Sequence, residues 1–397
     1  MTVIHLREAG PAVPVRLDVD AARRLAAAGV VDVRPGPAAG VWAVRAGRKV
    51  GAARIGGIEL HIEPKVPIAR LLFLAGYARN PTGWRDETVP LTEHAGLVPA
   101  LAAALWRQTD RALREGLLQG YRTVDATSSI LRGRLRETAQ LGRRAGLPLP
   151  LEIRHDEYTV DIPESRILAT AVDRMLRVPG IDAASRRMLR HLAARLAGIT
   201  RLRPGEPAPQ WHRTRLNERL VTALRLAELV LSDASVEAGR GSVPTNALLL
   251  DMWRVYENFL SVALRAAIES RHGGTVTFQT RHHLDDRCRL ELRPDLVWRR
   301  SRTEVGAVVD AKYKADTARE DAYQMLAYCV AYGLSRGHLV YAFGEHPPTR
   351  HVVRNAGIEI VCHTLDLGAD PPQLLAHIES LADEVTREDP SWTVALR

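Results

Sequence analysis

Two neighbouring segments, Arg293-Pro-Asp-Leu-Val-Trp298 and Ala307-Val-Val-Asp-Ala-Lys-Tyr-Lys314, decide the fold that we predict for the C-terminal half of the chain. Both read as β-strands, and the polar turn between them predicts a hairpin that brings Asp295 near Asp310. Side chains alternate along a strand, so Asp310 and Lys312 emerge on the same face. The sequence therefore predicts two carboxylates and an ammonium group that converge.

These residue types suit phosphodiester hydrolysis. Asp295, Asp310 and the carbonyl oxygen of Ala311 supply the hard oxygen ligands that Mg²⁺ prefers, with Mn²⁺ as a substitute. Such a metal lowers the pKa of a bound water and polarises the scissile phosphate. Lys312 can orient or deprotonate that water and stabilise the developing negative charge. We therefore expect a Mg²⁺-dependent DNA endonuclease of the PD-(D/E)xK type.

The preceding Pro-Asp distinguishes the acid-x-Lys triplet at 310–312 from one that occurs by chance. With 46 acids and four lysines in 397 residues, an acid-x-Lys triplet is expected roughly half a time by chance. A second such triplet, Glu63-Pro-Lys65, lacks a preceding Pro-Asp, and its proline would disturb a central strand. Pro294-Asp295 is the only Pro-Asp in the chain. A surface ion pair at a strand end is the alternative for Asp310 and Lys312.

Two predicted helices offer further site residues. The helix through 253–260 places Glu257 on a half-apolar face, from which a third acid could complete the site. On the helix after the motif, Asp321, Gln324 and Tyr328 share a polar face. Gln324 could bridge a DNA phosphate and the metal shell, or be an exposed amide.

Lysine is rare in this chain. Of the 55 basic residues 51 are arginine, and the lysines are Lys49, Lys65, Lys312 and Lys314. The imbalance is typical of codon bias in a GC-rich genome. Because arginine serves as well for a surface charge, each remaining lysine raises the question of why it is there.

Composition places the chain among folded soluble proteins of about two domains. The first twenty residues are too charged for a secretory signal, and no later stretch offers the roughly eighteen uncharged apolar residues of a membrane span. Cys288, Cys329 and Cys362 are odd in number and far apart, which argues against disulfides and zinc knuckles. We expect a cytoplasmic protein without a membrane contact. Its net charge of +9 suits a phosphate backbone.

The N-terminal half predicts an α+β domain with a β-rich start. Strands are expected at 13–17, 41–45 and 58–62, helices at 68–77 and 97–118, a strand pair within 121–138, and helices from Asp161 to about residue 200. The proline-rich stretch Arg203–Pro209 predicts a linker. We therefore place one domain at 1–205 and an endonuclease domain at 206–397.

The C-terminal half predicts an α/β domain with one mixed central sheet. Helices are expected at 215–232, 246–270 and 317–334, and strands at 276–281, 289–298, 305–311, 338–343 and 358–362. Thr317 and Glu320 have the spacing of a capping box at a helix start.

Arginines crowd one segment of the N-terminal half: Arg132, Arg134, Arg136, Arg143 and Arg144. They fit a contact with nucleic acid or an acidic protein surface, or a solvated charged face.

Several blocks together resemble the McrC family, the nuclease subunit of the McrBC 5-methylcytosine-specific (type IV) restriction system. In the C-terminal half they are Val255-Tyr-Glu-Asn-Phe-Leu260, Arg293-Pro-Asp295, Asp310-Ala-Lys-Tyr-Lys314 and Asp321-Ala-Tyr-Gln-Met-Leu-Ala-Tyr328. In the N-terminal half they are Gly57-Ile-Glu-Leu-His-Ile-Glu-Pro-Lys65, Leu131-Arg-Gly-Arg134 and Asp161-Ile-Pro-Glu-Ser-Arg-Ile-Leu168.

The resemblance implies an antiviral restriction nuclease that works with a partner. McrC-like proteins assemble with an McrB-like AAA+ GTPase ring, and their N-terminal domain, here 1–205, inserts into the ring and stimulates GTP hydrolysis. The chain has no GxxxxGK[ST] phosphate loop, so the motor is expected to be another polypeptide. The resemblance carries Asp295, Asp310, Lys312, Glu257 and Gln324 as site residues. It also implies that the Arg-rich segment or the N-terminal hairpins contact the ring.

Two other functions remain open. One is a free-standing repair or defence nuclease that uses the same site without a GTPase. The other is a non-catalytic activator of a AAA+ ring whose nuclease fold is vestigial. The intact Asp, Asp, Lys set argues against the second, and the long N-terminal half argues against the first.

Overall fold

The computed structural model describes residues 2–78, 81, 96–144, 147–203, 205–232, 246–314, 319–343 and 348–387. The chain forms two compact units, each assembled from three segments. Unit 1 comprises Met1–Val3, Ala52–Leu60 and Leu91–Leu248, and unit 2 comprises Ile4–Gly51, His61–Pro90 and Leu249–Arg397. The division of the chain into two functional domains at 205/206 stays a prediction.

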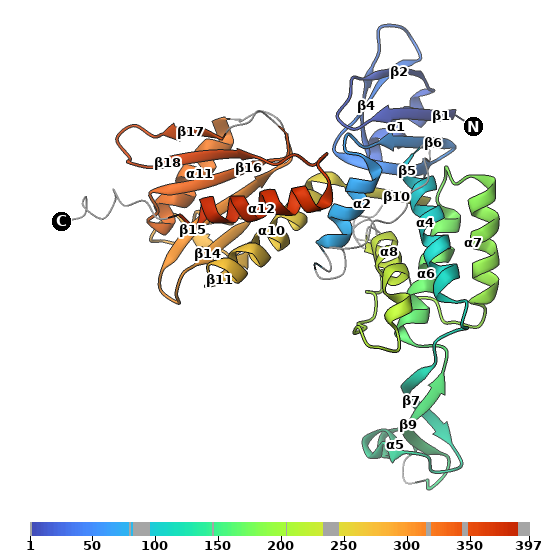
Figure 1. Ribbon diagram of the computed structural model, residues 1–397. Helices are drawn as coiled ribbons and strands as arrows, with labels where there is room; N and C mark the ends of the chain where they lie inside the picture. Colours follow the sequence, from blue (N-terminus) through green and yellow to red (C-terminus); the bar gives the residue numbers. More distant parts are fainter. Residues whose placement is uncertain are drawn as a thin grey trace. The chain divides into compact units, whose positions relative to one another are not determined.

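Unit 2 contains a six-stranded sheet that carries the predicted motif (Figure 1). Its strand order is β11 (Thr275–Phe278), β14 (Leu296–Arg299), β15 (Val305–Lys312), β16 (Arg336–Tyr341), β18 (Glu359–Thr364) and β17 (Thr349–Val352). The pairs β11–β14, β14–β15 and β17–β18 are antiparallel, whereas β15–β16 and β16–β18 are parallel. The expected mixed central sheet is thus confirmed.

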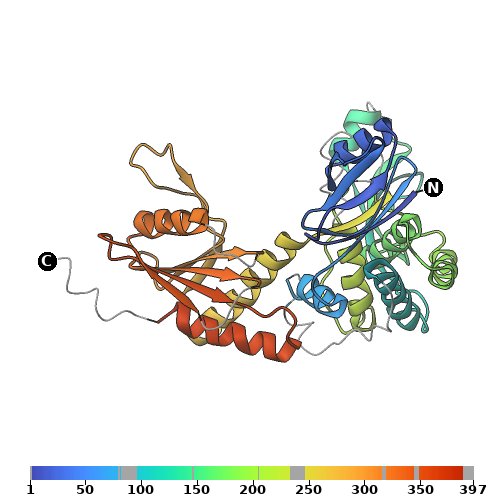
Figure 2. The ribbon, with the colours of Figure 1, turned by 90° about the horizontal axis from the view of Figure 1, so that it is seen from above.

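Helices cover both faces of this sheet (Figure 2). Helix α11 (Arg319–Tyr332) lies on one face, and α10 (Met252–Arg271) and α12 (Pro371–Val385) lie on the other. Helix α11 is the crossover that parallel neighbours such as β15 and β16 require. It approaches β16 so closely that a Cβ at Gly337 would lie 2.5 Å from the Met325 sulfur. The core beneath α11 is apolar and fixes this helix over the motif strand.

Two expectations for this half are corrected, and two elements were missed. Residues Asn246–Asp251 form strand β10 rather than the start of a helix; a short buried apolar run does not reveal its period. The strand expected at 289–298 is interrupted, with β13 (Glu291–Leu292) paired to β12 (His282–His283) before β14 begins. Strand β17 and helix α12 were not predicted. Thr317 of the expected capping box lies outside the described residues.

The β-rich start is confirmed. Strands β2 (Val13–Arg16), β4 (Val41–Ala46) and β3 (Val31–Pro35) form an antiparallel sheet in that order. Helix α1 (Val19–Ala27) begins after Asp18, whose carboxylate accepts a hydrogen bond from the Ala21 amide at 2.6 Å. Strands β1 (Thr2–Arg7), β5 (Lys49–Ile55) and β6 (Ile58–Glu63) and the buried helix α2 (Ile68–Tyr77) complete this part.

Unit 1 packs four helices together: α4 (Leu97–Ala112), α6 (Pro163–Arg177), α7 (Ala183–Arg195) and α8 (Val221–Ser232), the last preceded by the 3₁₀ turn η1 (Glu218–Leu220). From these helices projects an arm made of β7 (Gly120–Ser128), β8 (Arg134–Leu135), α5 (Glu137–Arg144) and β9 (Leu151–Thr159) (Figure 1). The expected pairing within 121–138 is wrong, because β7 and β8 both pair with β9.

Candidate active site

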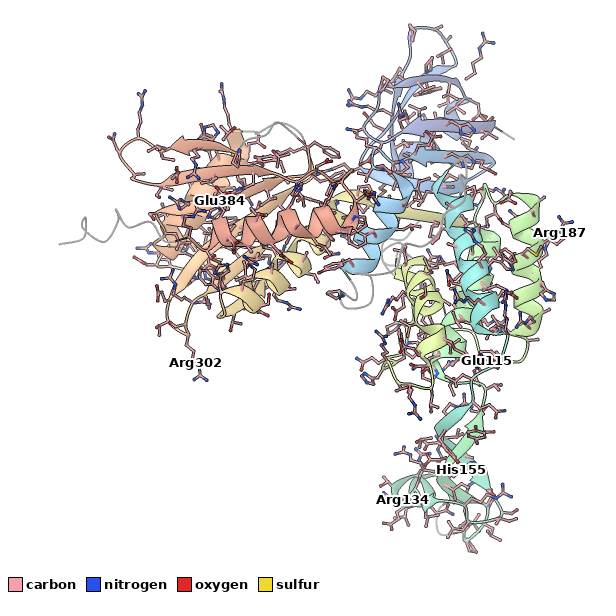
Figure 3. All side chains as sticks on the ribbon, in the orientation of Figure 1. Glu115, Arg134, His155, Arg187, Arg302 and Glu384 are labelled. Atoms are coloured by element: carbon pink, nitrogen blue, oxygen red, sulfur yellow. The ribbon has the colours of Figure 1, made fainter. Side chains whose placement is uncertain are left out.

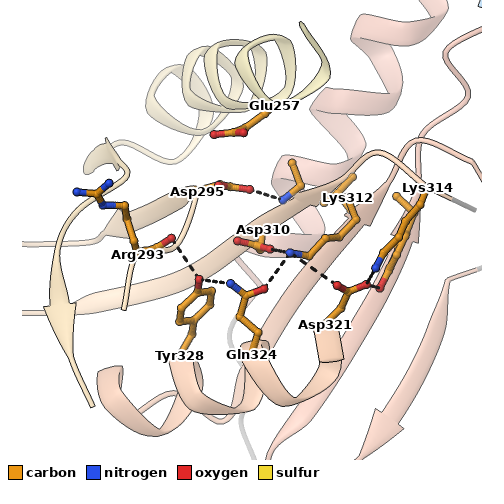
Figure 4. A network of polar contacts seen from close by, with 12 residues as sticks. Glu257, Arg293, Asp295, Asp310, Lys312, Lys314, Asp321, Gln324 and Tyr328 are labelled. Atoms are coloured by element: carbon orange, nitrogen blue, oxygen red, sulfur yellow. Dashed lines mark hydrogen bonds and ion pairs between the residues drawn. The ribbon is translucent and has the colours of Figure 1, made fainter. Parts of the chain in front are cut away.

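Strand pairing brings the two aspartates of the motif together (Figure 4). In the antiparallel β14–β15 pair Leu296 lies opposite Val309, so Asp295, one residue before β14, faces the position of Asp310. The Ala311 amide donates a hydrogen bond to Asp295 Oδ2 at 2.8 Å. Asp310 is 3% exposed, and its Oδ2 atom is buried without a hydrogen bond.

Lys312 shares a face with Asp310, as the alternation of the strand predicts. Its Nζ atom forms an ion pair with Asp310 Oδ2 and donates a hydrogen bond to Gln324 Oε1 at 3.0 Å. Its side chain is only 17% exposed, so the ammonium is confined between β15 and α11. The structure thus brings Asp295, Asp310, Lys312 and Gln324 to one place.

Glu257 reaches the same place from α10, through a residue that sequence reasoning missed. Gln279 Nε2 donates hydrogen bonds of 2.7 Å to Glu257 Oε1 and to Asp295 Oδ1. The backbone of Gln279 is in the left-handed region, with φ of 49°, which is uncommon for a residue other than glycine. No sequence pattern marked Gln279, since its position depends on the end of β11.

A chain of polar contacts on α11 orients the motif lysines. Gln324 Nε2 donates to the Tyr328 hydroxyl at 2.7 Å, and this hydroxyl donates to the Arg293 carbonyl at 3.2 Å. The buried carboxylate of Asp321 binds Lys314 Nζ at 2.7 Å and accepts from the Tyr341 hydroxyl at 3.0 Å. Asp321 also lies 3.8 Å from Lys312 Nζ. Tyr341 was not predicted, because β16 carries no motif.

The carboxylates repel one another. Burial, with the Asp310 and Glu257 carboxylates nearby, raises the pKa of Asp295 to about 8. Burial and the Asp310 charge also raise the pKa of Glu257. Burial opposes the charge of Lys312, but the carboxylates of Asp310, Asp321 and Asp295 together outweigh burial, and the pKa of Lys312 is raised. Lys312 is therefore a cation at neutral pH, among acids that resist ionisation together.

This donor set fits a hard divalent cation in its chemistry. Among the described residues, no three His, Cys, Asp or Glu side chains are arranged closely enough to enclose an ion. Asp295 and Glu257 nevertheless share the Gln279 amide as a hydrogen-bond donor, and Asp310 lies opposite Asp295, so three carboxylates face one space. A bound cation would relieve the repulsion that raises the pKa values of Asp295 and Glu257.

A family model and solved structures match this chain. A family model described as "McrBC 5-methylcytosine restriction system component" matches residues 44–342. The search of curated proteins gave no match. A solved half-complex of Thermococcus gammatolerans McrB AAA+ hexamers with bound McrC includes a chain with 18% identity and a TM-score of 0.59, over 96% of this chain and 100% of that one.

A second solved structure, of the Thermococcus gammatolerans McrBC complex, shares 20% identity over 67% of this chain and 88% of its own, at a TM-score of 0.39. At the identity of the first match the likeness concerns the fold alone. In the part of the chain that the structure describes, no helix is long and apolar enough to cross a membrane. The family match spans well over half of the sequence, and the chain belongs to the family of McrBC 5-methylcytosine restriction system components.

Proposed function

We propose that this chain is the Mg²⁺-dependent endonuclease subunit of a modification-dependent restriction system, with a PD-(D/E)xK nuclease domain. The observation that carries the proposal is the convergence of Asp295, Asp310 and Lys312 on the β14–β15 hairpin, with Glu257 facing them from α10. This combination of hard oxygen ligands and a confined ammonium suits phosphodiester hydrolysis.

Each side chain has a role in this proposal. Asp295, Asp310, the Ala311 carbonyl and Glu257 would hold Mg²⁺, or Mn²⁺ in its place. The bound cation supplies polarisation of the phosphate and a lowered pKa for a bound water. Lys312, a cation at neutral pH, orients the attacking water and neutralises charge on the phosphate oxygens. Gln324 holds the Lys312 ammonium, and Gln279 keeps Asp295 and Glu257 facing each other.

We further propose that the chain works with an McrB-like AAA+ GTPase ring and stimulates its GTP hydrolysis. Support comes from the family and from the fold shared with a chain of the McrB–McrC half-complex. The arm of unit 1 is the candidate contact (Figure 3). Its Arg136 pairs with Asp125, and Arg143 and Arg144 pair with Glu152.

Arg132 and Arg134 form no ion pair with the described residues. The rings of Tyr121 and Tyr158 pack against each other on the arm in a tilted arrangement, with centroids 5.1 Å apart, and the residues are 77% and 59% exposed. These unpaired cations and exposed aromatic rings are suited to a protein partner.

The test is cleavage of a cytosine-methylated plasmid by this protein with Mg²⁺, with and without an McrB-like AAA+ GTPase and GTP. We expect cleavage only with partner and GTP, and none with Lys312→Ala. Cleavage by the chain alone would favour the free-standing nuclease, whereas GTPase stimulation without cutting would favour the non-catalytic activator.

A further inference from the structure

A buried acid from the N-terminal segment lies at the end of the motif strand, where the proposed mechanism does not use it. Glu8 is 1% exposed, and its Oε2 atom accepts a hydrogen bond from the Lys65 amide at 3.0 Å. The Glu8 amide in turn donates to the Glu63 carbonyl at 2.9 Å. Glu8 is thus fixed by the segment that follows β6, within unit 2.

Glu8 is linked through Lys65 and Phe343 to Tyr313, the residue after Lys312, and its charge acts on the Tyr313 hydroxyl. Burial, with the Glu8 charge beside it, raises the pKa of Tyr313 well above its usual range. The Tyr313 hydroxyl is buried and forms no well-aligned hydrogen bond. Burying a hydroxyl without a partner is costly, so the adjacent Glu8 oxygens are its available acceptor.

The Tyr313 ring packs against two further aromatic rings. The Tyr313 ring packs edge-on against Phe343, with centroids 5.2 Å apart, and the Lys65 ammonium lies 5.7 Å from the Phe343 centroid. Tyr313 also packs 6.0 Å from Tyr256, the neighbour of Glu257 on α10. The Tyr256 hydroxyl donates to the Val340 carbonyl of β16 at 3.1 Å.

We propose that Glu8, Lys65, Tyr313 and Phe343 form an anchor by which the N-terminal segment positions Lys312 for catalysis. This β15 anchor rests on the proposed nuclease function and deepens it. Glu8 and Lys65 are positioning residues, since they act through Tyr313 and do not touch the reacting atoms. The anchor also gives Lys65, one of only four lysines, a function that the acid-x-Lys triplet around it does not supply.

The geometry explains why such an anchor is needed. Strand β15 ends at Lys312, and beyond it Lys314 turns back so that its amide donates to the Lys312 carbonyl at 2.9 Å. The end of a strand frays unless tertiary contacts hold it. A displacement of a catalytic group by about 1 Å can cost on the order of a hundredfold in rate. Fixing Tyr313 restricts Lys312 at the adjacent position.

The test measures amide hydrogen exchange and single-turnover cleavage on the full chain with its partner and GTP. Glu8→Gln, Lys65→Met and Tyr313→Phe are compared with Lys49→Met and Tyr332→Phe. The last two are matched controls, because Lys49 is a lysine outside the anchor and the Tyr332 hydroxyl is also buried without a hydrogen bond.

We expect the three anchor variants to raise exchange in peptide 308–314 about tenfold and the controls to leave it unchanged. Their cleavage rate should fall on the order of tenfold at unchanged DNA affinity. Glu8→Gln and Tyr313→Phe should be non-additive when combined, since both act on the same end of β15.

Unchanged exchange in peptide 308–314 would overturn the anchor whatever the cleavage result. An equal rise in the controls, or a rate loss that only follows the unfolded fraction, would also overturn it. If exchange rises as expected but the wild type and Lys312→Ala are equally without cleavage, the proposed nuclease function fails while the anchoring of β15 stands. The two failures are therefore distinguishable.

Discussion

The ion pair between Lys312 and Asp310 allows stability and catalysis to be tested separately. Replacing Lys312 by Met leaves the Asp310 carboxylate, 3% exposed and without a hydrogen bond on Oδ2, buried without its nearest cation. Orphaning one member of a buried pair costs about 3–5 kcal/mol. Since the Lys312 side chain is 17% exposed, we expect about 3 kcal/mol, the lower end of this range, for Lys312→Met in the absence of divalent metal.

The double variant Asp310→Asn/Lys312→Met removes both charges together. We expect it to recover most of the lost free energy of unfolding, because the buried charge is gone. Urea denaturation in EDTA measures this cycle, and single-turnover cleavage measures activity in parallel. All variants should lose cleavage by about a thousandfold or more.

Lys312→Arg should retain stability better than Lys312→Met but not activity, because the planar guanidinium fork is larger than the ammonium that lies between Asp310 and Gln324. The reasoning is refuted if Lys312→Met is as stable as the wild type, or if the double variant is less stable than both Lys312→Met and Asp310→Asn. It is also refuted if Lys312→Arg cleaves at the wild-type rate.

Three further outcomes follow from the structure. Gln279→Ala should weaken Mg²⁺ activation, because Glu257 and Asp295 lose the hydrogen-bond donor that they share. The Mg²⁺ concentration for half-maximal cleavage should rise about tenfold, and an unchanged Mg²⁺ dependence would contradict this. Ca²⁺ should support DNA binding without turnover, measured by filter binding beside cleavage, and rapid cleavage in Ca²⁺ would oppose the proposed chemistry. Burial, only partly opposed by the Glu384 carboxylate, lowers the pKa of His363 to about 4. The free energy of unfolding that is present above pH 6.5 should therefore fall, by up to about 3 kcal/mol, as the pH drops toward 4. His363→Gln should flatten this pH dependence in urea titrations, and an equally steep dependence in the variant would exclude His363 as its source.

Hairpin pairing and strand alternation predicted how Asp295, Asp310 and Lys312 come together, but not which other residues surround them. The opposition of Asp295 and Asp310 follows from one hairpin, and the shared face of Asp310 and Lys312 follows from strand alternation. Gln279 and Tyr341 could not be predicted, because they meet the motif through the pairing of β11 and β16, which no local pattern specifies.

The elements that were missed share a physical reason. Strand β9 lies on the arm and carries charged residues on both sides, so it shows no apolar alternation. Strand β17 is fully exposed at the sheet edge, with the same effect. Helix 246–270 was extended too far because the apolar run Ala247–Leu250 is buried on every side in β10. Hydrophobic period indicates an element only where one face is buried and the other is solvated.

Side-chain geometry gives a reason why lysine, and not arginine, stands at three positions of this arginine-rich chain. Lys312 fits between the Asp310 carboxylate and the Gln324 amide, and Lys314 reaches the buried Asp321. Lys65 lies over Phe343 at the other side of Tyr313. Each place accepts a compact point charge, whereas a planar guanidinium needs a wider, fork-shaped set of acceptors. In a chain with 51 arginines, three of the four lysines lie around the end of β15, where the function that we propose requires one small cation to be held in a fixed place.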